Sequence, residues 1–130
     1  MTQTGRIELM APAGSFESLQ AAITNGADSV YFGVDQLNMR ARASINFTIE
    51  DLSEIVRRCE ERKVRTYLTL NTIIYDHDLT IIKTLLDAAK DAGITAVIAM
   101  DQAVISYARQ IGMEIHISTQ SFMPCLLIRW

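Results

Sequence analysis

The sequence predicts an α/β fold in which parallel strands alternate with helices. Short apolar runs rich in β-branched and aromatic residues are separated by longer stretches whose apolar residues recur at helical spacing. Gly, Asn or Asp stands at the junctions between them. Because each helix carries the chain back to the same end of the sheet, the strands must run parallel.

The predicted strands are five short runs: residues 7–10, 29–33, 65–70, 96–100 and 114–118. A closed eight-stranded barrel of this kind takes about 250 residues. The 130 residues present here therefore fit either a small open sheet or about half of a TIM-barrel-like domain. We assign residues 1–120 to a partial (β/α) barrel with strands 1 to 5.

Four stretches with helical periodicity separate these strands. Their apolar stripes are Phe16, Leu19, Ala22 and Ile23; Leu52, Ile55, Val56 and Cys59; Leu79, Ile82, Leu86 and Ala89; and Val104, Tyr107, Ala108 and Ile111. The second stretch is entered through Thr48 and Asp51 in a capping-box pattern, and Asp101 is placed to cap the fourth. We expect Gly26, Gly93 and Gly112 to end the first, third and fourth helices.

The composition restricts the class of protein and its partners. The chain is 49% hydrophobic and 21% charged, which is typical of a soluble globular domain, and no run approaches the ~20 apolar residues that span a bilayer. The net charge of −3 supplies no global positive field, so any contact with RNA must be local. Cys59 and Cys125 form no Cys-x-x-Cys motif, and the amino terminus lacks a signal-peptide core. We expect a cytoplasmic location.

Candidate binding residues follow the strands, because ligands of α/β folds bind at the carboxyl ends of parallel strands. Gly14 closes a turn after the first strand, which either exposes backbone N–H groups to a ligand or is a plain strand-to-helix turn. Arg40 and Arg42 stand one residue apart after the second strand. They could hold a carboxylate or phosphate, or be a solvated surface pair. Asn71 ends the third strand.

A histidine lies between two aspartates in the loop after Asn71, at residues 76–78. This pattern could bind a metal ion, but Asp78 is more simply the cap of the next helix. We predict no metal site.

The fifth strand has one wholly polar face. Glu114, His116, Ser118 and Gln120 alternate there with apolar residues. Helices cover only one side of a barrel sheet, so this polar face must look into the barrel or a cleft. The face is either a binding site or a structural network. A hydrolytic pair of Ser118 and His116 is disfavoured, because residues two apart on a strand rarely reach hydrogen-bonding geometry.

Five motifs together resemble the peptidase U32 family, also called collagenase-like proteases. They are the Ala-Pro-Ala-Gly turn at 11–14, the Gly-Ala-Asp-x-Val-Tyr-x-Gly strand at 26–33, Arg-x-Arg at 40–42, Thr-Leu-Asn at 69–71 and His-x-Ser-Thr-Gln at 116–120. The resemblance implies the first half of a TIM-barrel-like amino-terminal domain of a longer protein.

The resemblance also implies an activity. Members of this family are implicated in oxygen-independent hydroxylation of tRNA, ribosomal RNA or the ubiquinone ring, some with an iron–sulfur cluster and some linked to prephenate. On this reading Arg40 and Arg42 bind an anionic group, Gly14 and Ser118 contact the substrate, and Asn71, His116 and Gln120 line the catalytic pocket. True proteolysis is the alternative. Neither cysteine matches the cluster ligands of such relatives, so we expect no cofactor in this chain.

Residues 121–130 depart from the family pattern, because they are mostly apolar where the family is polar. We interpret this tail as the product of truncation or a changed reading frame. A barrel that stops after strand 5 leaves two sheet edges unpaired. We therefore expect the chain to associate with itself through those edges or the tail, and an inactive half-barrel remains the third reading.

Overall fold

The computed structural model describes residues 7–34, 47–70 and 79–117. Its elements, in chain order, are β1 (Met10–Pro12), α1 (Phe16–Thr24), β2 (Ser29–Phe32), the 3-10 turn η2 (Ile49–Asp51), α2 (Leu52–Glu61), β3 (Arg65–Leu70), α3 (Leu79–Ala92), β4 (Ala96–Ala99), α4 (Gln102–Gln110) and β5 (Glu114–Ile117). The predicted alternation of strands and helices is confirmed.

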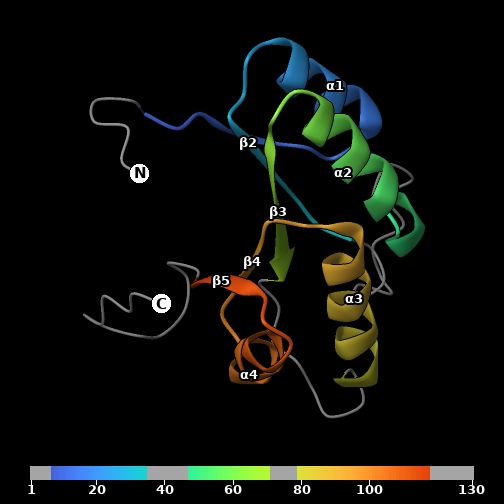
Figure 1. Ribbon diagram of the computed structural model, residues 1–130, viewed down its shortest axis with the longest axis vertical. Coiled ribbons are helices and arrows are strands. Elements are labelled where there is room, and N and C mark those ends of the chain that lie inside the picture. Colours follow the sequence, from blue (N-terminus) through green and yellow to red (C-terminus); the bar gives the residue numbers. More distant parts are fainter. Residues whose placement is uncertain (1–6, 35–46, 71–78, 118–130) are drawn as a thin grey trace.

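The strands form one parallel sheet in the order β1-β2-β3-β4-β5. Right-handed crossovers that always step to the next strand place every helix on the same side of the sheet. Figure 1 shows this arrangement, in which α1 to α4 follow one another along one side. The other side, which would be the interior of a barrel, carries no helix among residues 7–34, 47–70 and 79–117. Within the described residues, no helix is long and apolar enough to cross a membrane.

The core lies between the helices and the sheet. One row of paired residues runs across four strands and is almost fully buried: Phe32, Leu68, Val97 and Ile115. The predicted stripe of α2 packs onto the sheet with all four members buried. Phe47 joins the two layers, since its ring meets those of Phe16 and Phe32 edge to face at 5.0 and 5.6 Å.

The helix ends follow the predicted chemistry. Gly26, Gly93 and Gly112 follow α1, α3 and α4 with φ of 90°, 95° and 78°, a region open to glycine at little steric cost. At the start of α4, the Asp101 carboxylate accepts a hydrogen bond from the backbone N–H of Ala103 at 2.8 Å. At η2, the Asp51 carboxylate accepts one from the backbone N–H of Thr48 at 2.9 Å.

The first strand begins three residues later than predicted and ends two residues later. The apolar run 7–10 suggested it, but Met10–Pro12 pairs with Ser29–Tyr31. The position is fixed just before the strand, where the Asp28 carboxylate accepts a hydrogen bond from the backbone N–H of Leu9 at 2.8 Å. Pro12 is tolerated because β1 is an edge strand and needs fewer ladder donors. Ile7 is 88% exposed, so its apolar character did not indicate a strand.

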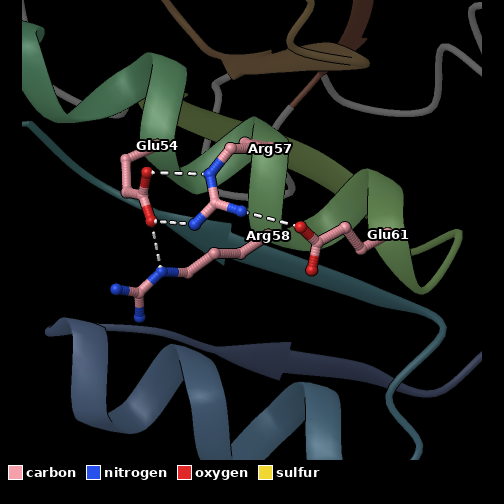
Figure 2. Close-up of polar contacts among 4 residues, drawn as sticks. All are labelled: Glu54, Arg57, Arg58 and Glu61. Atoms are coloured by element: carbon pink, nitrogen blue, oxygen red, sulfur yellow. Dashed lines mark hydrogen bonds and ion pairs between the residues drawn. The ribbon is translucent and has the colours of Figure 1, made fainter.

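An ionic cluster lies on the outer surface of α2 (Figure 2). Arg57 donates two hydrogen bonds to Glu54 at 3.0 and 2.6 Å and one to Glu61 at 2.7 Å, while Arg58 donates to Glu54 at 2.7 Å. The Arg58 guanidinium also lies over the Phe16 ring of α1, 4.7 Å from its centroid. The hydrogen bonds from Arg57 and then Arg58 lower the pKa of Glu54 to about 2. Glu54 therefore holds in place the side chain that links α2 to α1.

Replacing Glu54 with Gln should destabilise the chain only above acidic pH. A carboxyl whose pKa is lower in the folded than in the unfolded state stabilises the fold above its unfolded pKa and loses that effect as the pH falls toward the folded value. The urea midpoint of Glu54→Gln should therefore lie below that of wild type at pH 6, and the two should converge as the pH falls from about 5 toward 2. Glu60→Gln, an exposed change on the same helix, is the control. A difference that persists at pH 2 would contradict this account.

Candidate functional site

Two of the predicted site residues, Gly14 and His116, lie in the part of the chain that the structure describes. The other five, Arg40, Arg42, Asn71, Ser118 and Gln120, lie outside it. The acidic loop at residues 76–78 and Cys125 lie outside it as well. The geometry of the candidate site is therefore built from His116 and from the residues that surround it on the sheet.

His116 faces away from the helices. It alternates along β5 with Ile115, which packs into the core beneath them, and it pairs in register with Ile98 of β4. Successive residues of a strand point to opposite faces of the sheet, so His116 lies on the open, concave face, as the alternating pattern predicts. Its side chain is 42% exposed. Whether it serves a ligand stays a prediction.

Glu114 is the hydrogen-bonding partner of His116. Its Oε1 lies 2.8 Å from Nε2 of the imidazole. Both side chains point to the same face of the sheet, and that of Glu114 spans the distance between them. The expectation that Ser118 and His116 do not reach hydrogen-bonding geometry concerns a residue outside the described part of the chain. The sequence did show Glu114 on the polar face, but not as a partner.

Tyr67 covers one side of the imidazole, although it belongs to β3, two strands away. The two ring centroids lie 5.1 Å apart with an interplanar angle of 41°. Ala96 of β4 stands between them in register, paired with Tyr67 on one side and Glu114 on the other. Because Ala96 has only a methyl group, the longer side chains of the flanking strands can meet above β4.

A polar cluster fixes the other end of Tyr67 at the amino end of the sheet. Glu8 Oε2 accepts hydrogen bonds from Ser29 Oγ at 2.8 Å and from the Tyr67 hydroxyl at 3.4 Å, and Glu8 also forms an ion pair with Arg65. These contacts join the segment before β1 to β2 and β3. Sequence reasoning missed Glu8 and Tyr67. The register of β1, β2 and β3 is the signal that would have placed them together.

Gly14 lies between β1 and α1 and is exposed. It has no left-handed backbone conformation, and a Cβ atom added to it would meet nothing within 4 Å. The turn therefore does not require glycine for its conformation or its packing. The helix is instead capped by Ser15, whose Oγ accepts a hydrogen bond from the backbone N–H of Ser18 at 3.1 Å.

The described residues do not fit an iron–sulfur cluster or another bound metal. Cys59 is fully buried in the core, on the helix side of the sheet. Burial raises the pKa of its thiol to about 11, which disfavours the thiolate that binds metals. Across residues 7–34, 47–70 and 79–117, no three His, Cys, Asp or Glu side chains lie close enough to hold a metal ion.

Comparison with known proteins identifies relatives along most of the chain. The model of peptidase family U32 matches residues 14–124. A protein named collagenase from Porphyromonas gingivalis is 56% identical over 113 residues, which are 87% of this chain and 27% of that protein. The tRNA hydroxylation protein P1 of Bacillus subtilis is 34% identical over 90% of this chain and 28% of its own length.

The fold agrees with that of a solved relative. The U32 peptidase Mk0906 superposes with a TM-score of 0.63 at 11% sequence identity, over 90% of this chain and 50% of that structure. The predicted α/β fold and half-barrel architecture are thereby confirmed. The chain spans about a quarter of the length of the two curated relatives.

The contact between Tyr67 and His116 should depend on the small side chain of Ala96. In Ala96→Leu a larger side chain occupies the space above β4, so the two rings should separate. The ring-proton resonances of His116 should then lose the ring-current shift that Tyr67 imposes, as measured by NMR of the whole chain. Ala21→Leu, an exposed change on α1, is the control and should leave these resonances in place. Unchanged His116 resonances in Ala96→Leu would contradict the contact.

Proposed function

The chain belongs to peptidase family U32, and from that membership we propose that the full-length protein hydroxylates RNA rather than cleaving peptides. A relative that covers 90% of this chain is named for tRNA hydroxylation. Ribosomal RNA is the other RNA substrate that we propose for this kind of protein. Because the chain is about a quarter as long as its curated relatives, the activity belongs to the longer protein.

The relative named for tRNA hydroxylation carries this proposal. The environment of His116 is compatible with it, because an imidazole that contacts the Glu114 carboxylate and lies 5.1 Å from the Tyr67 ring can hydrogen-bond to and stack on a planar heterocycle. A carboxylate also orients the histidine of serine hydrolases, so the preference for RNA rests on the relative. Cys59 is unsuited as a nucleophile, since burial raises the pKa of its thiol to about 11.

We propose the remaining roles from the family motifs. Arg40 and Arg42 would hold a phosphate or carboxylate at the carboxyl end of the sheet, which gives a net negative chain a local site for an anion. Asn71 and Gln120 would line the pocket with His116, and Gly14 and Ser118 would contact the substrate. Any iron–sulfur cluster of the full-length protein would be held by residues beyond this chain. A cytoplasmic location would give the enzyme access to its RNA.

Proteolysis is the second candidate, and it is favoured by the 56% identity to a protein named collagenase. It requires a nucleophile on the same face as His116, and Ser118 is the candidate that the sequence offers. An inactive half-barrel that associates with itself is the third reading.

Deletion of the gene that encodes this chain should remove a hydroxylated nucleoside from cellular RNA. Mass spectrometry of nucleosides from purified tRNA and ribosomal RNA would detect the loss, and complementation with the full-length gene should restore it. An unchanged modification profile would contradict RNA hydroxylation. Peptide hydrolysis by the pure full-length protein that is abolished by Ser118→Ala would establish the protease instead.

Replacing Arg40 or Arg42 with Ala in the full-length protein should weaken anion binding. A desolvated, charge-assisted contact contributes roughly 1.5–3 kcal/mol, so each change should lower the affinity for RNA at fixed salt by about tenfold or more. Filter binding measures this loss, with Arg62→Ala, an exposed change after α2, as the control. Equal affinity in all variants would make the two arginines ordinary surface charges.

A further inference from the structure

We propose that Glu114 is a positioning residue that fixes the imidazole of His116 as its Nε2–H tautomer and presents Nδ1 as a hydrogen-bond acceptor on the concave face. The ligand class that follows is a planar heterocycle with an N–H donor, such as the amino group of cytosine. Naming this ligand rests on the proposed function, whereas the tautomer itself does not.

The tautomer follows from the chemistry of the two partners. An ionised carboxylate accepts hydrogen bonds and donates none, so the 2.8 Å contact between Oε1 and Nε2 requires a proton on Nε2. In the neutral ring the other nitrogen, Nδ1, then carries a lone pair. A hydrogen bond to one ring nitrogen is the ordinary way in which proteins set the role of the other.

A second contact, separate from the hydrogen bond to Glu114, restricts the orientation of the His116 ring. The Tyr67 ring contacts the imidazole in a tilted arrangement, with centroids 5.1 Å apart and an interplanar angle of 41°, and Glu8 accepts a hydrogen bond from the Tyr67 hydroxyl at 3.4 Å. Glu114 therefore sets the in-plane direction of the ring, while Tyr67 limits its tilt. The side chain of His116 stays 42% exposed, so part of its surface is open to a ligand.

Nδ1 is suited to be the group that meets the ligand. Within the part of the chain that the structure describes, the side-chain hydrogen bond of the His116 ring is the one that Nε2–H donates to Glu114. A partly exposed imidazole with an acceptor nitrogen can recognise a flat substrate in two ways. The ring stacks on the substrate, and Nδ1 accepts a hydrogen bond from an N–H group of the substrate. A bound carboxylate or phosphate would not suit it, because a lone pair and an anion repel each other.

The tautomer can be measured directly in the whole 130-residue chain, since it has only two histidines. Long-range ¹H–¹⁵N NMR spectra at pH 8.5 distinguish the two tautomers by the shifts of Nδ1 and Nε2. A His77→Gln background leaves His116 as the only imidazole in the spectrum. In that background, with Glu114 in place, the His116 imidazole should be mainly in the Nε2–H form.

Removing the carboxylate should change the ratio of the two tautomers. In Glu114→Ala the ratio of the Nε2–H to the Nδ1–H form should fall about fivefold, the effect of losing an exposed pair of about 1 kcal/mol. Glu60→Ala, an exposed change on α2, is the control and should leave the ratio unchanged. Glu114→Gln should give a ratio between those of wild type and Glu114→Ala, because its amide can either accept a bond from Nε2–H or donate one to a bare Nε2.

Two results would overturn the proposal: a mainly Nδ1–H ring in the wild type, or an unchanged ratio in Glu114→Ala. The amide spectrum of each variant shows whether the chain is folded, so loss of structure is distinguished from loss of positioning. None of these measurements uses RNA. The tautomer assignment and the proposed RNA hydroxylation can therefore fail separately.

Discussion

The constraint on which the rest of the structure depends is the one-directional order of a parallel sheet. Each right-handed crossover adds a strand on the same side of the last, so α1 to α4 cover one face, and within the described residues no helix covers the other. Side chains alternate between these faces along every strand. The side chains of residues such as Leu68 and Val97 point toward the helices and pack in the core. Their neighbours in sequence therefore point to the opposite face, which is the interior side of a barrel.

That division explains why polar groups gather on one side. On the helix face the buried side chains are mostly apolar, and the exception, Thr66, accepts a hydrogen bond from the backbone N–H of Thr95 at 3.1 Å. On the concave face, Ser29 and Tyr67 are buried but bonded to Glu8, and His116 is bonded to Glu114. In the described residues, no buried side-chain nitrogen or oxygen atom is without a hydrogen-bond partner. The amino end of this face is occupied by a network in which Glu8 is bonded to Ser29, Tyr67 and Arg65.

The sequence predicted those features that depend on neighbours along the chain. Helical stripes, the Asp101 cap and the glycines after three helices are local, and the structure confirms them. Features that depend on register were missed or misplaced. The start of the first strand was placed three residues early, because Asp28, and not the apolarity of Ile7, sets where pairing begins. The roles of Tyr67 and Ala96 were missed for the same reason, since their contact with His116 crosses two strands and no spacing along the chain encodes it.

Pro12 removes one backbone hydrogen-bond donor from the outer edge of β1. The backbone N–H of Ala13 bonds inward to the carbonyl of Tyr31 at 2.9 Å, so the backbone nitrogen of the preceding residue points outward, toward the place of a next strand. At that place proline offers no hydrogen atom. A strand arriving at this edge meets an interrupted row of donors, a known device against unwanted edge pairing. Among the described residues, the outer edge of β1 therefore lacks one backbone donor, at Pro12.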